Sequence, residues 1–219
     1  MFTRAHRSGF RALCWLALVL GALPVVAQQL TRDVDYRLIS QQPVASRERV
    51  EVIEFFFYGC PYCRELTPLL AGWLTRKPAD VEFRRVPVVR HDSWVPLAKT
   101  YYTLEAMGAA ERLHQAVYHG QQVEDLALSQ ENVIAEWAEK HGLDRDQFLS
   151  IYRSDAIRAK IERARQMTLD YEIKGTPSLV VDGRFLTSSG MTDGVPQVIP
   201  VLDGLIALAR QLRLEKSGK

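Results

Sequence analysis

The chain has 219 residues, with 28 Lys and Arg against 26 Asp and Glu. The first 27 residues contain three arginines and no acid, which leaves residues 28–219 with 25 basic and 26 acidic side chains and a formal charge of −1. This balance gives no electrostatic basis for binding nucleic acid or a membrane surface, and about 190 residues suffice for one domain with a sizeable core.

Residues 1–27 have the pattern of a secretory signal peptide. Three arginines form a basic start, an uncharged apolar run follows at 12–27, and small residues precede the expected cleavage between Ala27 and Gln28. The alternative is a retained membrane anchor, but a span needs about 20 apolar residues and this run is shorter. We therefore expect export to an oxidising compartment.

Only Cys60 and Cys63 remain once residues 1–27, which include Cys14, are set aside. A disulfide between them closes a loop too short to stabilise the fold, so chemistry explains the pair better. The pair follows an apolar, aromatic-rich run at 52–58, typical of a buried strand, and precedes a helical pattern. A strand, a turn and Cys-x-x-Cys at a helix start is the arrangement of a redox-active dithiol.

The alternative for such a cysteine pair is half of a zinc site. Residues 28–219 offer no second cysteine pair to complete it. Their histidines fall in a separate helical stretch or its approach: His91, His114, His119 and His141. We therefore predict no metal, and no cofactor beyond the redox-active disulfide itself.

The stretch around the dithiol predicts a β-α-β unit, preceded by a short edge strand at 36–39. Strands are expected at 50–58 and 81–89, joined by a helix from Pro61 to about Thr75. Proline suits the first helical position, because its missing N–H would be unpaired there anyway. The unit implies parallel pairing of the two strands and a right-handed crossover.

Apolar residues then recur with a helical period from 93 to about 172, which predicts a block of five helices. We expect Gly108 and Gly120 to end the first two. The expected N-caps of the other three are Ser129, Asp144 and Ser154.

Beyond this block, residues 178–186 predict a hairpin that turns at Asp182-Gly183, and a final helix is expected at about 195–214. This order of elements is that of an α/β fold, a thioredoxin-like core with an inserted all-helical domain. The expected parts are the core's first part at 28–92, the insertion at 93–172 and the core's second part at 173–219.

The position of the dithiol at a helix start suggests a role for each residue in it. Free amide hydrogens and the positive end of the helix dipole favour a thiolate at Cys60, which we predict to be the nucleophile. Cys63 lies about one turn further and deeper, so we expect it to be the resolving thiol. Pro61 and Tyr62 lie between the two cysteines.

Glu54 is an acid within the apolar run, where burial would raise its pKa. It is a candidate proton acceptor beneath Cys63. The alternative is a strand-end acid that reaches solvent, as we expect for Glu51. We also expect Arg84 and Arg85 to form a solvated strand end.

Thr176-Pro177 opens a strand, where proline is unusual outside an edge or a turn. A cis bond here would bring the loop against the dithiol and leave the backbone of Thr176 free to bind an extended substrate peptide. Taken alone, the dipeptide leaves the choice between cis and trans open.

Three stretches are specific in combination: Glu-Phe-Phe-Phe-Tyr-Gly-Cys-Pro-Tyr-Cys at 54–63, Ser-Trp-Val-Pro-Leu-Ala at 93–98 with the run that follows to Gly108, and Gly-Thr-Pro-Ser at 175–178 with Val-Asp-Gly at 181–183. Together they resemble the DsbA family of periplasmic thiol:disulfide oxidoreductases. The resemblance covers nearly all of residues 28–219, and the helical insertion lies at the expected place.

The resemblance implies that the Cys60–Cys63 disulfide is donated to newly exported proteins with free thiols. A quinone-linked membrane partner, DsbB, would reoxidise it. The resemblance also implies that Pro177 is a cis-proline facing the dithiol and that Glu54 is the buried acid of the family.

The resemblance also implies that the dipeptide between the cysteines, Pro61 and Tyr62, tunes the thiolate. Two residues depart from the usual pattern of the family. Tyr62 stands where the usual dipeptide has histidine, which helps to stabilise the thiolate, so a weaker oxidant is expected. Thr176 stands where enteric DsbA has valine, and threonine there is also found in periplasmic isomerases. Those isomerases carry an N-terminal dimerisation domain, for which the stretch between Gln28 and Cys60 leaves no room.

The sequence thus predicts a monomeric periplasmic thiol:disulfide oxidoreductase that forms a mixed disulfide at Cys60. One alternative is a reductase or isomerase on the same scaffold. A different class of protein is also possible, namely a peptide-binding, chaperone-like module whose dithiol is incidental.

Overall fold

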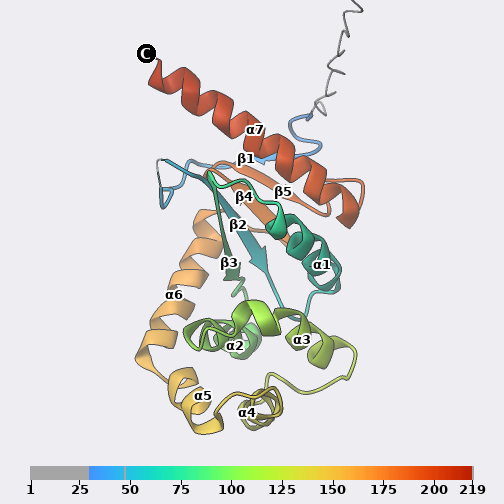
Figure 1. The fold of residues 1–219 in the computed structure, drawn as a ribbon, viewed down its shortest axis with the longest axis vertical. Coiled ribbons are helices and arrows are strands. Elements are labelled where there is room, and N and C mark those ends of the chain that lie inside the picture. The colour runs from blue at the N-terminus through green and yellow to red at the C-terminus, as the bar shows by residue number, and fades with distance from the viewer. Residues whose placement is uncertain (1–29, 47, 219) are drawn as a thin grey trace, which may run out of the picture.

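The computed structural model describes residues 30–46 and 48–218. The predicted signal peptide and its cleavage point at Ala27/Gln28 lie outside the described residues. Within them, one five-stranded sheet has the order β1-β5-β4-β2-β3 (Figure 1). Its strands are β1 (Arg37–Leu38), β2 (Val50–Phe56), β3 (Val81–Pro87), β4 (Ser178–Val181) and β5 (Phe185–Ser188).

β2 lies inside the sheet because its sequence is apolar on both faces, and every one of its residues is buried. It pairs in parallel with β3 and antiparallel with β4. α1 (Pro61–Thr75) connects β2 to β3, so the predicted β-α-β unit is confirmed. This helix buries Leu66, Leu70 and Trp73.

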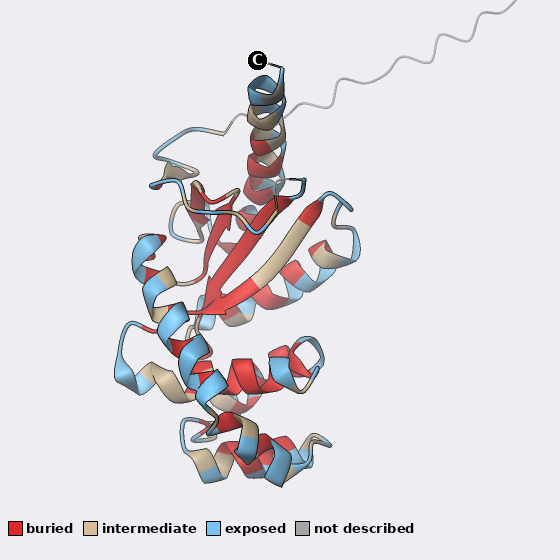
Figure 2. Ribbon diagram, turned by 90° about the vertical axis from the view of Figure 1, so that its left-hand side faces the viewer, coloured by how far each residue is buried: buried red, intermediate tan, exposed pale blue. Residues whose placement is uncertain are grey.

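Helices cover both faces of the sheet (Figures 1 and 2). α1 and α7 (Val198–Ser217) lie on one face, where Val52 of β2 and Leu205 of α7 belong to the same buried cluster. α6 (Asp155–Asp170) runs along the other face, and Tyr171 at its end packs on Phe55 of β2. The sheet is therefore the middle layer of three.

Among the described residues, α7 and the turn η2 (Val195–Gln197) before it form the one helical stretch long and apolar enough to cross a membrane, Val195–Lys216. Its first half is buried against the sheet, with Leu202 and Leu205 fully enclosed. Its last turns are exposed and project beyond the sheet (Figure 2). These are the contacts of a core helix.

The chain between β3 and β4 is helical, as predicted, and α2 to α5 gather beyond the ends of β2 and β3 nearest the dithiol (Figure 1). The limits 28–92, 93–172 and 173–219 for the three parts stay a prediction. The elements before α6 are η1 (Asp92–Trp94), α2 (Val95–Ala106), α3 (Ala110–Gln122), α4 (Glu131–Lys140) and α5 (Arg145–Tyr152).

Two of the expected helix ends are wrong. Gly120 does not end α3 but lies inside it, where an added Cβ would come to 3.0 Å from Nε1 of Trp137 and 3.2 Å from Cδ1 of Leu128. Here glycine permits close packing and does not stop the helix. Ser129 does not cap α4, whose N-cap is Gln130 without a side-chain hydrogen bond.

Other expected ends are confirmed by hydrogen bonds or dihedral angles. The side chains of Asp144 and Ser154 accept from the backbone N–H three residues on, at the starts of α5 and α6. β4 and β5 form the predicted hairpin, with positive φ at both Asp182 and Gly183. β5 continues to Ser188, two residues beyond the predicted strand.

Candidate active site

Cys60 is the N-cap residue of α1, and Pro61 follows at the first helical position. The apolar strand β2 ends at Phe56, and the short turn after it delivers the cysteine to the helix start. There the first N–H groups of a helix have no intrahelical partner, so they face the thiol sulfur. Cys60 is half-buried and its thiol donates to the carbonyl oxygen of Thr176, with Sγ and O 3.1 Å apart.

The surroundings of Cys60 lower the pKa of its thiol to about 6. A hydrogen bond from the Cys63 thiol is the largest cause, and partial burial opposes it. A side-chain hydrogen bond from Thr176 and the backbone N–H groups of Cys63 and Tyr62 lower the pKa further. The carbonyl of Thr176 favours the thiol, but its side chain favours the thiolate, and the donors together outweigh the single acceptor.

Cys63 has the opposite environment. Its side chain is fully buried, and burial raises the pKa of its thiol well above the ordinary value. Donating to Cys60 and repulsion from the Cys60 charge raise the pKa further, and the charge of Glu54 adds to this. The two thiols of one Cys-x-x-Cys are thus strongly different acids.

Thr176-Pro177 lies against the dithiol, and its peptide bond is cis. A groove of about 530 Å³ runs along this loop, bordered by Tyr62 and by residues of the β4–β5 side such as Leu186 and Met191. Tyr62 is more than half exposed at the groove edge. The structure therefore brings Cys60, Cys63, Tyr62, Thr176 and Pro177 together.

Glu54 is fully buried on β2, and burial is the largest influence on its pKa, which is raised. Arg85 on β3 stands directly opposite and donates from Nε to Glu54 Oε2 at 2.8 Å. The expectation of a solvated Arg85 is wrong, because β3 continues to Pro87 and places this side chain inside the protein. A second contact joins Arg85 to Glu111 of α3.

Glu51 and Arg84 form a second such pair on the opposite face of the sheet. Successive strand residues point to opposite faces, so Arg84 and Arg85 diverge, and so do Glu51 and Glu54. Arg84 Nε donates to Glu51 Oε1 at 3.0 Å, and Glu51 is only 1% exposed. The expectation that Glu51 reaches solvent is therefore wrong.

Sequence reasoning missed Gln122 at the end of α3. Its side-chain amide donates to the carbonyl oxygens of Tyr58 at 2.7 Å and of Cys60 at 3.1 Å. This fixes the turn that carries the dithiol. Nothing in the sequence near Gln122 indicates this contact, because the two segments meet only through the packing of α3 on α1.

A buried aromatic cluster beside the dithiol was also missed. The Tyr58 hydroxyl and Nδ1 of His114 are hydrogen-bonded at 2.9 Å. Each of these two rings packs edge-on against Phe56, and the two are tilted relative to each other. Burial lowers the pKa of His114 well below its ordinary value, so its imidazole is neutral. In the sequence, only the position of Tyr58 at the end of the apolar run 52–58 indicated that its ring would be buried.

Among residues 30–46 and 48–218, no group of three or more His, Cys, Asp or Glu side chains lies close enough to hold a metal ion. The two thiols are free in this structure and adjacent, as a dithiol that cycles with a disulfide requires. The chemistry that this arrangement can perform is thiol–disulfide exchange.

Comparison with known proteins gives the same answer. Residues 74–198 match the model of the DSBA-like thioredoxin domain. The thiol:disulfide interchange protein DsbA of Azotobacter vinelandii is 34% identical over 168 residues, which cover 77% of this chain and 78% of the relative. The chain belongs to the DsbA family. The DsbA of Pseudomonas aeruginosa is 32% identical over 84% of this chain and 88% of the relative.

Solved DsbA structures share the fold. The crystal structure of Pseudomonas aeruginosa DsbA superposes with a TM-score of 0.80, at 32% identity, over 84% of this chain and 96% of that one. The predicted family, the thioredoxin-like fold with its helical insertion and the activity of a thiol:disulfide oxidoreductase are thereby confirmed. DsbA proteins act through a redox-active disulfide.

Proposed function

We propose that this DsbA-family protein oxidises thiols of exported proteins with its Cys60–Cys63 disulfide. A substrate thiolate attacks the sulfur of Cys60, a substrate–Cys60 disulfide forms and the bond to Cys63 breaks. The Cys63 thiolate then takes up a proton. A second substrate thiolate attacks the substrate's own sulfur in the mixed disulfide, and Cys60 leaves as a thiolate. Two electrons pass from the substrate to the dithiol.

The observation that carries this proposal is the contrast between the two thiols. At pH 7 a pKa of about 6 leaves about nine-tenths of Cys60 as thiolate in the reduced form, which makes it the better leaving group. The thiolate exists only in the dithiol state, so its stabilisation favours reduction of the disulfide, as an oxidant requires. Cys63 is too deeply buried to be attacked first.

Glu54 is proposed to exchange the proton of Cys63. The departing Cys63 thiolate has a strongly raised pKa in a site without solvent, so it needs an internal proton source. Glu54 has a raised pKa for a carboxyl group, and its charge is felt at Cys63. Oε1 of Glu54 makes no hydrogen bond to any described residue, so its lone pairs are free to accept the transferred proton.

The groove beside the cis-proline is proposed to hold the substrate. Thr176 presents backbone beside Cys60, where an extended peptide could pair with it, and Tyr62 offers an exposed ring to apolar side chains. Pro61 and Tyr62 are proposed to set the strength of the oxidant through the helix start that they form. A tyrosine lacks the positive charge of a protonated histidine, which supports a moderate oxidant.

The proposed compartment and partners rest on membership of the DsbA family and on the signal-peptide pattern of residues 1–27. We propose that cleavage near Ala27/Gln28 releases a monomer into the periplasm, where unfolded exported proteins with free thiols are its substrates. A DsbB-like, quinone-linked membrane oxidoreductase would return the dithiol to the disulfide. Neither nucleic acid nor a metal enters the proposal.

The direct test is oxidative refolding of a reduced, disulfide-containing exported protein with catalytic amounts of this protein. The wild type should accelerate disulfide formation, and the double variant Cys60→Ala, Cys63→Ala should not. If the double variant promotes folding as well as the wild type does, the protein is a chaperone-like binder and the redox proposal fails.

A further inference from the structure

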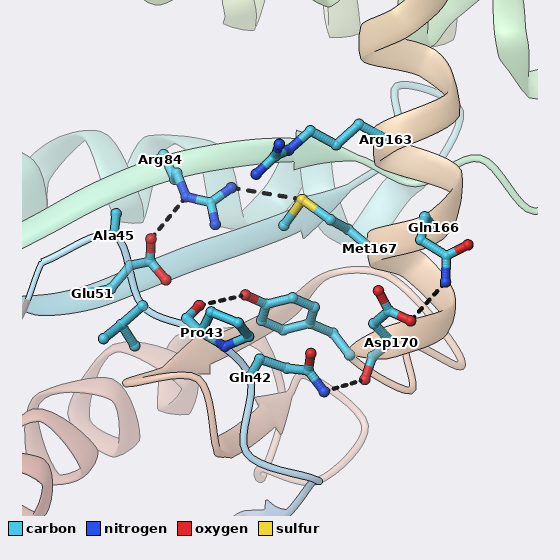
Figure 3. A pocket seen from close by; sticks show the side chains of 11 residues that line it. Gln42, Pro43, Ala45, Glu51, Arg84, Arg163, Gln166, Met167 and Asp170 are labelled. Carbon is cyan, nitrogen blue, oxygen red and sulfur yellow. Dashed lines mark hydrogen bonds and ion pairs between the residues drawn. The ribbon is translucent and has the colours of Figure 1, made fainter.

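A second pocket, of about 610 Å³, lies away from the dithiol on the other face of the sheet (Figure 3). It is bordered by residues 42–45, by Glu51 and Arg84 on the strands, and by α6. Glu51 is at the start of β2 and Cys60 follows the end of that strand, so the two sites are roughly 20 Å apart. Thiol–disulfide exchange does not account for this pocket.

The carboxylate of Glu51 is incompletely bonded. Its Oε1 accepts from Arg84, but its Oε2 is buried and has no hydrogen-bond partner among the described residues. Figure 3 shows this second oxygen turned toward the space between Arg84 and Pro43. A buried carboxylate oxygen without a donor is costly, so it marks a position where a ligand N–H group would bind favourably.

Two guanidinium groups border the pocket, Arg84 beside Glu51 and Arg163 on the opposite side (Figure 3). Arg163 of α6 points back over the pocket toward Arg84 (Figure 3) and, within the described part of the chain, makes no ion pair. Beyond Glu51, Arg84 meets neutral groups, the sulfur of Met167 at 3.9 Å and the side chain of Tyr171. Asp170, the other acid of the pocket, is held by Gln166 at 2.7 Å. The arginines therefore offer N–H donors to an anion.

The space between these charges is lined by apolar groups. Pro43 and the ring of Tyr171 form one wall, and the flexible side chain of Met167 forms another. Such a wall accepts an aliphatic or aromatic side chain. A bare phosphate would meet the carboxylate of Glu51, and a bare amine would leave Arg163 unused, so neither matches the whole set of groups.

We propose that this pocket binds the α-carboxylate and the neighbouring N–H group of an apolar amino acid residue. The carboxylate accepts from Arg84 and Arg163, the N–H donates to Glu51 Oε2, and the side chain packs on Met167 and Pro43. A free amino acid and the C-terminal residue of a peptide share this chemistry.

The test measures dissociation constants by calorimetry for L-leucine, N-acetyl-L-leucine and L-leucinamide. At least one of the first two should bind the wild type, and L-leucinamide, which lacks the carboxylate, should bind at least about tenfold more weakly. Arg163→Gln should weaken binding about tenfold. Arg165→Gln is the matched control, because Arg165 lies on the same helix and pairs with Asp92 outside the pocket.

Arg163 is exposed, so its variant should fold, which circular dichroism verifies. Tighter binding of L-leucine than of N-acetyl-L-leucine assigns the site to free amino acids, and equal or weaker binding assigns it to peptide C-termini. The proposal is overturned if neither ligand binds at about 10 mM, if Arg163→Gln binds like Arg165→Gln, or if L-leucinamide binds as tightly as the carboxylates.

Discussion

The buried pair of Glu54 and Arg85 gives the sharpest stability prediction. The Glu54 side chain is fully buried and that of Arg85 is 3% exposed, and the two are joined at 2.8 Å. Arg85→Met removes the charge and keeps an apolar stem of similar length. It leaves Glu54 as an uncompensated acid in the core, whereas Glu54→Leu leaves Arg85 paired with the exposed Glu111.

The expected loss of stability differs between replacing one partner of the Glu54–Arg85 pair and replacing both. Removing one partner of a buried ion pair costs about 3–5 kcal/mol, and replacing both by apolar residues is often neutral. We therefore expect Arg85→Met to lower the free energy of unfolding by about 3–5 kcal/mol at pH 7. Glu54→Leu should cost less, since Glu111 still neutralises the arginine. The double variant Glu54→Leu, Arg85→Met should be more stable than Arg85→Met.

The loss in Arg85→Met should depend on pH. Burial raises the folded-state pKa of Glu54 above the ordinary 4.5, and the charge of Arg85 holds it down. Without Arg85 that pKa rises further. A carboxyl group whose pKa is raised by folding favours the folded state fully below its unfolded pKa, and this contribution is lost as the pH rises through the folded pKa. The deficit should therefore shrink as the pH falls from 7 toward 4.5.

Urea unfolding of the reduced proteins at pH 7 and pH 5 measures all of these differences. A cost below about 1 kcal/mol for Arg85→Met would refute the reasoning, because that is the range of exposed ion pairs. So would a double variant less stable than Arg85→Met, or a deficit that grows as the pH falls.

Two further predictions concern the dithiol and the packing of α3. In the reduced protein, iodoacetamide should alkylate Cys60 with an apparent pKa near 6, while Cys63 stays unreactive. Alkylation of Cys63 before Cys60 would show that the two roles are assigned the wrong way round. Gly120→Ala should lower the free energy of unfolding in urea by about 1–3 kcal/mol, because its Cβ would crowd Trp137. Gly72→Ala in α1 is the control, because an added Cβ there would contact no other atom. It should raise the free energy of unfolding by about 0.4–1 kcal/mol. Equal effects of the two substitutions would refute the packing argument.

The sequence predicted the dithiol, its helix and the βαβ unit because these depend on local pattern. The apolar run of β2, Gly59 and Pro61 leave few conformations for the segment that carries Cys60. The hairpin at Asp182-Gly183 was equally local, since only a turn with positive φ suits that dipeptide between strands. The insertion was visible as a change of hydrophobic period.

Local pattern did not predict where the arginines of β3 lie, although the alternation of side chains along a strand bears on it. Two adjacent arginines looked like a solvated end, but an alternating strand sends Arg84 and Arg85 to opposite faces. The spacing of Glu51 and Glu54 on β2 does the same with the carboxylates. The pairing register, which sequence alone did not supply, sets Arg85 directly opposite Glu54, and the folded structure brings Arg84 to Glu51.

The roles of Gly120 and Gln122 could not be predicted because they depend on contacts between helices. A glycine in a helical pattern predicts a helix end, yet Gly120 lies inside α3 and packs closely against the side chain of Trp137 on another helix. Gln122 holds the carbonyls of the dithiol turn from more than sixty residues away. Both roles arise from tertiary contacts between helices, for which a single sequence carries no periodic signal.

Equilibrium with glutathione distinguishes an oxidant from a reductase, because it measures how stable the Cys60–Cys63 disulfide is. The protein is incubated at pH 7 in reduced and oxidised glutathione poised at about −220 mV, and the fraction with Cys60 and Cys63 as a disulfide is measured after acid quenching and alkylation. Because the Cys60 thiolate stabilises only the dithiol, we expect the dithiol form to dominate. A disulfide that dominates in this buffer would contradict this expectation and indicate a reductase.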